Sequence, residues 1–194
     1  ETVVASIGQG FIQSTPLQLA VMTSRLINGG KAVKPWLTIA IDEKLQEAEK
    51  PEDVGINKAH LRLMKQAMDE VTMGERGTAR GSRIYETGLE MGGKTGTSQV
   101  RRITMRERDL GMKNEDLPWR LRHHALFVGY APISNPRYVC SVVVEHGGGG
   151  SKAAAPIAKE LLLATQKRDP AAKSIILDEN KLAKHLKKPI TEPR

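Results

Sequence analysis

Apolar residues recur at helical spacing soon after the start of the chain. Thr15 can cap a helix and Pro16 fits the first helical position, while Gln18 stands where a capping box requires it. The glycine pair at positions 29–30 tolerates left-handed backbone geometry and marks the end of the pattern. The pattern predicts a helix between Thr15 and this pair, followed by an extended segment over residues 34–39.

A second helix is expected from about residue 57 to residue 71, after a polar surface segment over residues 42–55. Leu61, Met64 and Met68 follow the spacing of one helix face. Methionine fills irregular gaps in protein cores, so we expect both methionines to be buried.

The second half of the chain changes to strand patterns. Residues 94–100, 124–131 and 137–145 predict three short strands, the last two joined by turn residues at 132–136. A third helix is predicted over residues 153–167. Helices that precede and follow a run of strands indicate an antiparallel sheet with segregated helices, so the predicted fold class is α+β. We expect the two early helices to pack elsewhere in the domain, away from this sheet.

The length and charge of the chain limit its organisation and partners. Its 194 residues suit one domain, and we assign residues 1–168 to that domain and residues 169–194 to a polar, flexible tail. The net charge is +8, but aromatic residues make up only 4% of the chain, which disfavours stacking on nucleic acid bases. Residues 101–122 are charged and predict a long surface excursion between two strands. Its basic cluster consists of Arg101, Arg102, Arg106 and Arg108.

The cysteine and histidine content predicts neither disulfide nor metal chemistry. Cys140 is the single cysteine, and its apolar surroundings predict a small core residue. His123, His124 and His146 lack further ligands at metal-binding spacing, so structural or surface roles are expected. The glycines at 147–150 predict a tight connection between a strand and a helix. No stretch approaches the ~18 apolar residues that a membrane span needs.

Residues 88–98 match two different signatures. Gly88, Gly93, Lys94 and Thr95 have the spacing of a phosphate-binding loop. Such a loop follows an apolar strand and opens a helix, whereas the residues after Thr95 are poor helix formers. A nucleotide-binding protein is therefore an alternative that the flanking sequence disfavours.

The same residues also fit a strand at the edge of a cleft. Alternation along a strand places Lys94 and Gly96 on one face and Thr95 and Thr97 on the other. Gly96 removes a side chain where another backbone must approach closely. An ammonium group with neighbouring hydroxyls suits a carboxylate ligand, and an outward-pointing amide at Thr97 suits an oxyanion hole. Lys94-Thr95-Gly96 is the Lys-Thr-Gly element of penicillin-binding proteins and class A β-lactamases.

The surrounding segments strengthen this second interpretation. From about residue 3 to residue 167 the chain resembles the transpeptidase domain of the penicillin-binding protein 2 family, the elongation-class peptidoglycan synthases of bacteria. The similar segments are Ala-Ser-Ile-Gly-Gln-Gly at 5–10, Thr-Pro-Leu-Gln-Leu-Ala at 15–20, Asn-Gly-Gly at 28–30, Gly-Thr-Ala at 77–79, His-His-Ala-Leu-Phe-Val-Gly-Tyr-Ala-Pro at 123–132, Val-Val-Glu-His-Gly-Gly at 143–148 and Ala-Ala-Pro-Ile-Ala at 154–158.

The resemblance implies a β-lactamase/transpeptidase-like sandwich and a D,D-transpeptidase that β-lactams acylate. It implies catalytic roles for Lys94 and Thr97, substrate binding by Thr95, Gly96 and Thr97, and no metal or organic cofactor. The family's Ser-x-x-Lys nucleophile and Ser-x-Asn element are absent, because no serine here has lysine three residues on or asparagine two residues on. We therefore expect the C-terminal part of a transpeptidase domain, inactive alone, with an upstream half that supplies the serine.

The resemblance also implies a cellular setting. The partners expected are peptidoglycan stem peptides, β-lactams, the upstream half of the same protein and other cell-wall elongation proteins, but not nucleic acid. The expected location is the periplasmic face of the bacterial inner membrane, with the anchor outside this chain. A non-catalytic β-lactam sensor of the same fold remains a further alternative.

Overall fold

A three-stranded antiparallel sheet forms the centre of the computed structural model, which describes residues 13–38, 40–41, 44–46, 49–101 and 103–170. Its strands are β3 (Gly92–Ser98), β4 (His124–Ala131) and β5 (Tyr138–Val144), in the order β3-β4-β5. All three predicted strands are confirmed, with bounds that differ by no more than two residues. Most of the predicted tail, from residue 171 onward, lies outside the described residues.

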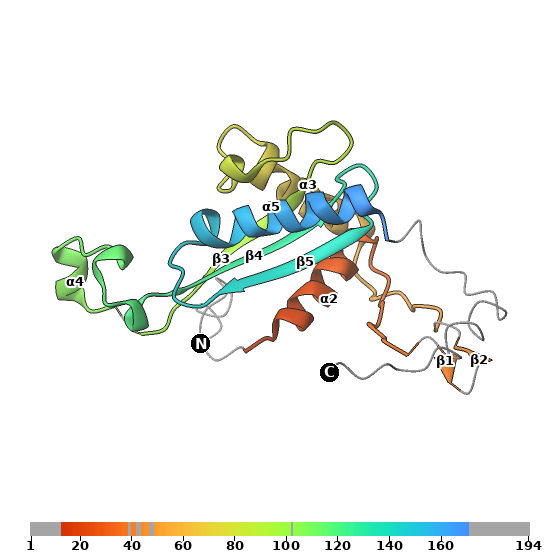
Figure 1. Cartoon of the computed structure of the whole chain (residues 1–194), viewed down its shortest axis with the longest axis horizontal. Helices are drawn as coiled ribbons and strands as arrows, with labels where there is room; N and C mark the ends of the chain where they lie inside the picture. Colours follow the sequence, from red (N-terminus) through yellow and green to blue (C-terminus); the bar gives the residue numbers. More distant parts are fainter. Residues whose placement is uncertain (1–12, 39, 42–43, 47–48, 102, 171–194) are drawn as a thin grey trace, which may run out of the picture.

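One face of the sheet is covered by helix α5 (Gly150–Arg168), which lies across the strands in Figure 1. Ala125, Phe127 and Ala131 alternate along β4 and point toward this helix. They form a continuous core with small and aliphatic residues of α5. The buried helix residues in this core are Ala154, Ala155, Ala158 and Leu162. The helix begins at Gly150, three residues earlier than the sequence predicts. Its first residue belongs to the glycine run that was expected to form only the connection from the strand.

The opposite face is covered by α2 (Pro16–Ile27) and α3 (Lys58–Met73). Helix α2 packs against β5 and β4, and α3 packs against β3. The expectation that the two early helices pack away from the sheet is therefore wrong. Tyr130 shows the contact: it lies on the other face of β4 from Phe127, and its hydroxyl bonds to Asp69 of α3. The sheet lies between two helix layers, which confirms the predicted α+β sandwich.

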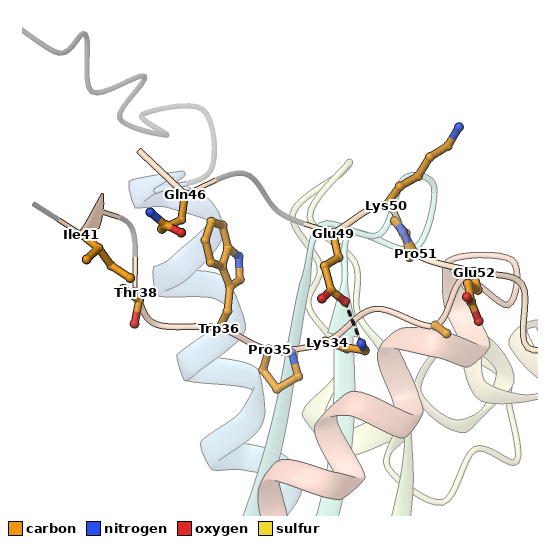
Figure 2. Close-up of a pocket in the computed structure, with 11 residues that line it drawn as sticks. Lys34, Pro35, Trp36, Thr38, Ile41, Gln46, Glu49, Lys50, Pro51 and Glu52 are labelled. Atoms are coloured by element: carbon orange, nitrogen blue, oxygen red, sulfur yellow. Dashed lines mark hydrogen bonds and ion pairs between the residues drawn. The ribbon is translucent and has the colours of Figure 1, made fainter. Parts of the chain in front are cut away.

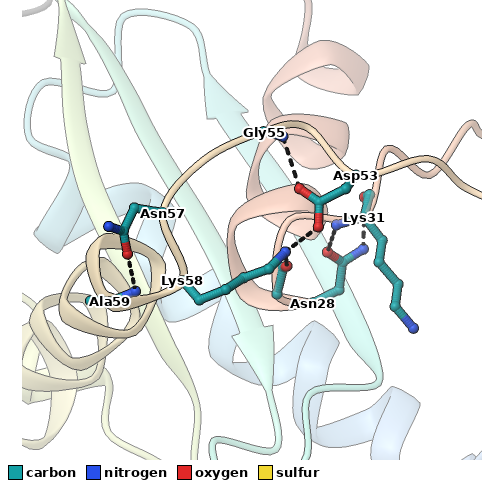
Figure 3. Close-up of polar contacts among 8 residues, drawn as sticks. Asn28, Lys31, Asp53, Gly55, Asn57, Lys58 and Ala59 are labelled. Carbon is teal, nitrogen blue, oxygen red and sulfur yellow. Dashed lines mark hydrogen bonds and ion pairs between the residues drawn. The ribbon is translucent and has the colours of Figure 1, made fainter.

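Helix α2 begins and ends where the sequence predicts. The Thr15 hydroxyl accepts the Gln18 N–H at 3.2 Å, and the Gln18 side chain accepts the Thr15 N–H at 2.8 Å. Beyond the helix, Asn28 exchanges hydrogen bonds with the backbone of Lys31. The Lys58 ammonium then bonds to the Gly29 carbonyl at 2.7 Å and pairs with Asp53, which ties the end of α2 to the start of α3 (Figure 3).

Helix α3 buries a different stripe from the one expected. Leu61 and Met68 are buried as predicted, but Met64 is 48% exposed. The stripe continues through Lys65 and Thr72, so it follows i+4 and i+7 spacing and leaves Met64 on its flank. Lys65 bridges to Asp69 at 3.0 Å beside the Tyr130 ring, so a charged residue rather than Met64 faces the sheet there.

Residues 101–122 leave the sheet as the predicted surface excursion, but they are not irregular throughout. They contain α4 (Met105–Asp109) and the 3₁₀ turns Asn114–Asp116 and Trp119–Leu121. In Figure 1 the excursion lies beyond one end of the sheet, and the small hairpin β1 (Ala40–Ile41) and β2 (Lys44–Leu45) lies beyond the other. Within the described residues, no helix combines the length and apolar character of a membrane span.

Candidate functional site

Residues 94–98 run extended along β3 and pair with β4. The register places Lys94 opposite Val128, Gly96 opposite Leu126 and Thr97 opposite Ala125. No helix opens after Thr95, and the next one along the described chain is α4 (Met105–Asp109). A phosphate-binding loop needs the N-terminus of a helix at this point, so the nucleotide-binding alternative is wrong.

The register also fixes the direction of each side chain. Thr95 and Thr97 pair with Phe127 and Ala125, so they lie on the α5 face of the sheet. Lys94 and Gly96 lie on the opposite face, as the alternation predicts. A β-carbon at Gly96 would lie 3.2 Å from the Leu126 Cβ, with no other side chain within 4 Å. The face that carries Lys94 is therefore open above Gly96.

The outer edge of β3 is unpaired among the described strands, and its peptide groups point outward there. The Lys94 ammonium donates to the Thr95 carbonyl at 2.9 Å, which places that carbonyl on the open edge. Peptide groups of alternate residues point to the same edge of a strand, so the Thr97 N–H points outward as well. Lys94 and Thr97 are exposed and Thr95 is half-buried. An ammonium group on one face of β3 and hydroxyls on the other therefore flank the same open strand edge, where the backbone donor lies.

Thr78 joins the site, although sequence reasoning did not single it out as a site residue. Its hydroxyl lies 3.2 Å from the Thr95 hydroxyl. Position 77 requires glycine, because a β-carbon there would come within 2.5 Å of the Val71 carbonyl. This close packing of the loop on α3 positions Thr78. The only signal in the sequence is that Gly-Thr-Ala at 77–79 belongs to the family resemblance. The contact spans 17 positions and depends on how the loop after α3 packs on β3.

The start of α5 lies directly on the candidate strand. A β-carbon at Gly150 would come within 2.3 Å of the Leu126 carbonyl oxygen and 2.6 Å of the Gly96 carbonyl oxygen. Such distances are shorter than real β-carbons adopt, so only glycine lets the helix begin at this point. Gly150 therefore sets how closely α5 supports the backbone of Gly96.

The two main cavities found among the described residues lie elsewhere, and neither is lined by a residue of β3. One, of about 490 Å³, lies between residues 32–38 and the hairpin segment, where Trp36 stands beside Gln46 (Figure 2). Lys34 pairs with Glu49 there at 2.7 Å, and this contact lowers the pKa of Glu49. The other, of about 570 Å³, is an open groove along α2. Among the described residues, no cluster of His, Cys, Asp or Glu could hold a metal ion.

A sheet between helix layers, with a Lys-Thr-Gly strand on its open edge, is the arrangement of the penicillin-recognising acyl transferases. The chain belongs to the family of the penicillin binding protein transpeptidase domain, whose match covers residues 1–163.

Relatives in this family are similar along most of the chain. It is 36% identical to the peptidoglycan D,D-transpeptidase MrdA of Haemophilus influenzae, over 84% of this chain and 25% of that protein. The crystal structure of Pseudomonas aeruginosa PBP2 in complex with WCK 5153 has a TM-score of 0.65 at 36% identity, over 84% of this chain and 31% of that one. Helicobacter pylori PBP2, in its complex with MreC, has a TM-score of 0.69 at 27% identity, over 86% and 27% of the two chains. The chain spans about a quarter of the length of the curated relatives it matches.

Proposed function

We propose that this chain supplies the Lys-Thr-Gly strand of a peptidoglycan D,D-transpeptidase. In this reaction a serine hydroxyl attacks a peptide carbonyl of the donor stem peptide and expels its terminal amino acid as an amine. An amine of a second strand then attacks the acyl ester, which forms the cross-link and releases the serine. The observation that carries the proposal is that residues 94–98 lie extended along the open edge of β3.

Each site residue has a role that its position supports. The Lys94 ammonium, exposed on the face of β3 opposite α5, favours the charged transition state and assists proton transfer. Thr95 and Thr97 bind the carboxylate of the donor peptide or β-lactam through their hydroxyls. The missing side chain at Gly96 admits the substrate backbone, and the outward Thr97 N–H is one of two oxyanion donors.

The nucleophile belongs to a segment upstream of this chain in our proposal. No serine here is followed three residues later by lysine, and the matched region is about a quarter of the curated relatives. The isolated chain is therefore inactive in this account. The complete protein acts on the periplasmic face of the inner membrane, with its anchor outside this chain. The complex of Helicobacter pylori PBP2 with MreC supports other cell-wall elongation proteins as partners.

Labelling with a fluorescent penicillin tests the proposal. The polypeptide that carries this chain together with its upstream half should become covalently labelled, and the chain of 194 residues alone should not. Covalent labelling of the isolated chain would contradict the assignment of the nucleophile. An upstream half without a Ser-x-x-Lys serine, or a complete protein that penicillin fails to acylate, would exclude the transpeptidase.

Two substitutions in the complete protein assign the roles. Lys94→Ala should lower the acylation rate constant by roughly 10²- to 10⁴-fold, because it removes the cation that assists proton transfer. Thr97→Val should lower the acylation rate constant by roughly 10- to 100-fold, because one hydrogen bond to a carboxylate is lost. Lys50→Ala is the matched control, since Lys50 is exposed and lies outside β3. Equal rates for Lys94→Ala and Lys50→Ala would remove Lys94 from the site.

A further inference from the structure

Three histidines gather where the excursion over residues 101–122 joins the sheet. The Val100 N–H, just beyond β3, donates to Nδ1 of His123 at 3.3 Å. The His146 N–H, just beyond β5, donates to Nδ1 of His124 at 2.9 Å. Nδ1 of His146 lies 2.9 Å from the Arg122 carbonyl oxygen and therefore carries the proton. We call His123, His124 and His146 the histidine clasp.

The clasp has the features of a built arrangement. The His146 backbone is left-handed with φ of 55°, which is unfavourable for a residue with a β-carbon. Its ring lies 4.7 Å from the His124 ring and 4.6 Å from the Trp119 ring, measured between centroids. The backbone of His123 is bonded at both ends, to the Asn114 side chain and to the Gly148 N–H. The return of the excursion is thus held against the turn that leads into α5.

The clasp lies directly beside the candidate active-site strand. His124 pairs with Ser98 in the β3–β4 ladder, and Thr97 is the next residue along β3. Because Val100 bonds to His123, the exit of β3 and the base of the excursion are fixed together. A change in the clasp would therefore move the backbone next to Thr97.

We infer that His123 and His124 are positioning residues, whose neutral rings fix the exit of β3 and the excursion beside Thr97 and release both when they are protonated. This inference rests on the proposed transpeptidase function. Both rings accept a main-chain N–H at Nδ1, and a proton at Nδ1 would face that N–H with a second donor. His146 donates from Nδ1 in either state, so its bond to Arg122 survives protonation.

The surroundings of His123 favour its neutral ring. Burial lowers the pKa of His123, and Arg101 and His124 lower it further. Charged groups on the surrounding segments include Glu107, which pairs with Arg101, and Glu115, which pairs with Lys152 of α5. Further charged residues on these segments are Lys113, Asp116, Arg120, Arg122 and Glu145. Among the described residues, neither accepting ring is hydrogen-bonded to a carboxylate.

The test compares acylation by a fluorescent penicillin at pH 7.5 and pH 5.5 in the complete protein. The variants are His123→Asn and His124→Asn, because asparagine offers an acceptor near the position of Nδ1 and does not titrate. His60→Asn is the control, since His60 is exposed on α3. The ratio of wild-type to variant rate cancels the titration of the catalytic groups. This ratio should fall roughly three- to tenfold on acidification for the clasp variants and stay constant for the control.

Hydrogen exchange of the Val100 and His146 amides gives a readout that needs no catalysis. After correction for intrinsic rates, protection of both amides should fall on acidification in the wild type. It should persist at Val100 in His123→Asn and at His146 in His124→Asn. Unchanged protection in the wild type, or rate ratios that do not depend on pH, would overturn the inferred role of His123 and His124. Failure of the wild type to react with penicillin at any pH would overturn the proposed function instead, while the exchange data would still decide whether the clasp responds to protons.

Discussion

Tyr130 is fully buried in β4, yet its hydroxyl is satisfied by the Asp69 carboxylate and lies 3.3 Å from the Lys65 carbonyl. Burial and the neighbouring carboxylate raise the pKa of Tyr130, so the phenol stays a hydrogen-bond donor throughout the pH range of folding. One polar group thereby fixes α3 against the sheet.

We predict that Tyr130→Phe lowers the free energy of unfolding by about 1.5–3 kcal/mol, the range for a hydrogen bond to a charged group. The change leaves the Asp69 carboxylate, which is 20% exposed, with its bridge to Lys65 but without the phenol. Urea denaturation measures the effect. Tyr85→Phe is the control, because Tyr85 is 76% exposed and should change stability by less than about 0.5 kcal/mol. Equal effects of the two variants would contradict the role of the Tyr130 hydroxyl.

Cys140 offers a second test at the residue scale. It is buried on the α5 face of β5, and burial raises the pKa of its thiol to about 11. Since thiolate is the reactive form, we expect labelling by a thiol reagent at pH 8 to be at least roughly a hundredfold slower than in the unfolded protein. Absorbance of the released chromophore in buffer and in urea measures both rates. Rapid labelling of the folded protein would show that Cys140 is accessible.

At the scale of elements, the contact between α5 and β3 decides where the candidate strand lies. Gly150→Ala should lower stability by about 1–3 kcal/mol, because the new β-carbon would collide with the backbones of Leu126 and Gly96. It should also slow acylation in the complete protein, since Gly96 moves with the strand. Gly149→Ala is the matched control: a β-carbon there meets nothing within 4 Å. Thermal unfolding and labelling rates are measured on both variants. Equal results for the two would contradict the predicted role of the contact between α5 and β3.

Local signals predicted most of the elements. The Thr15–Gln18 capping box and the glycines after Asn28 define α2 within the chain itself, so no tertiary information was needed. Alternation and turn residues gave the three strands for the same reason. The prediction that Met64 is buried was wrong, because helical spacing alone allows either of two neighbouring positions to be buried. Lys65 lies on the packed side of α3 because this part of the helix meets Tyr130. That contact joins residues 65 positions apart, so local spacing could not predict it.

For the candidate site, too, local sequence predicted one part and missed the part that depends on tertiary contacts. Lys94 through Thr97 were predicted because their chemistry and alternation lie in consecutive residues of one strand. Thr78 and the histidine clasp were missed because each contact joins segments far apart in the sequence. His123 and His124 were expected to have structural or surface roles, and only the direction of their hydrogen bonds indicates a link to the site.

At the scale of the whole molecule, the sheet is covered on both faces but open along its edges. In the described part of the chain, β3 and β5 each have one unpaired edge. The open edge of β3 leaves backbone donors and acceptors available to an extended peptide. Large apolar side chains also remain exposed along α2, with Leu17 60% and Met22 46% exposed. The molecule thus combines a well-packed centre, which holds the strand in place, with surfaces that the core does not cover.

The stability of the whole molecule should depend on pH between about 5 and 7. Burial, Arg101 and His124 lower the pKa of His123 in the folded state, so the unfolded chain binds more protons in this range. The free energy of unfolding therefore rises with pH: the contribution of His123 is fully present above the unfolded pKa and is lost as the pH falls through the folded pKa. The carboxylates with lowered pKa, such as Glu107 and Glu115, lose their contributions at lower pH, so this window separates histidines from those carboxylates. The His123 variant then separates the share of His123 from that of the other histidines.

Urea denaturation midpoints at pH 5, 6 and 7 measure this dependence. The wild-type midpoint should fall as the pH is lowered, and His123→Asn should flatten the curve because asparagine keeps an acceptor for the Val100 N–H without titrating. His60→Asn should leave the slope unchanged, since that histidine is exposed. A slope that persists in His123→Asn would assign the acid sensitivity to other groups. A slope that disappears would make a buried ring beside the candidate strand a main source of acid sensitivity in the fold.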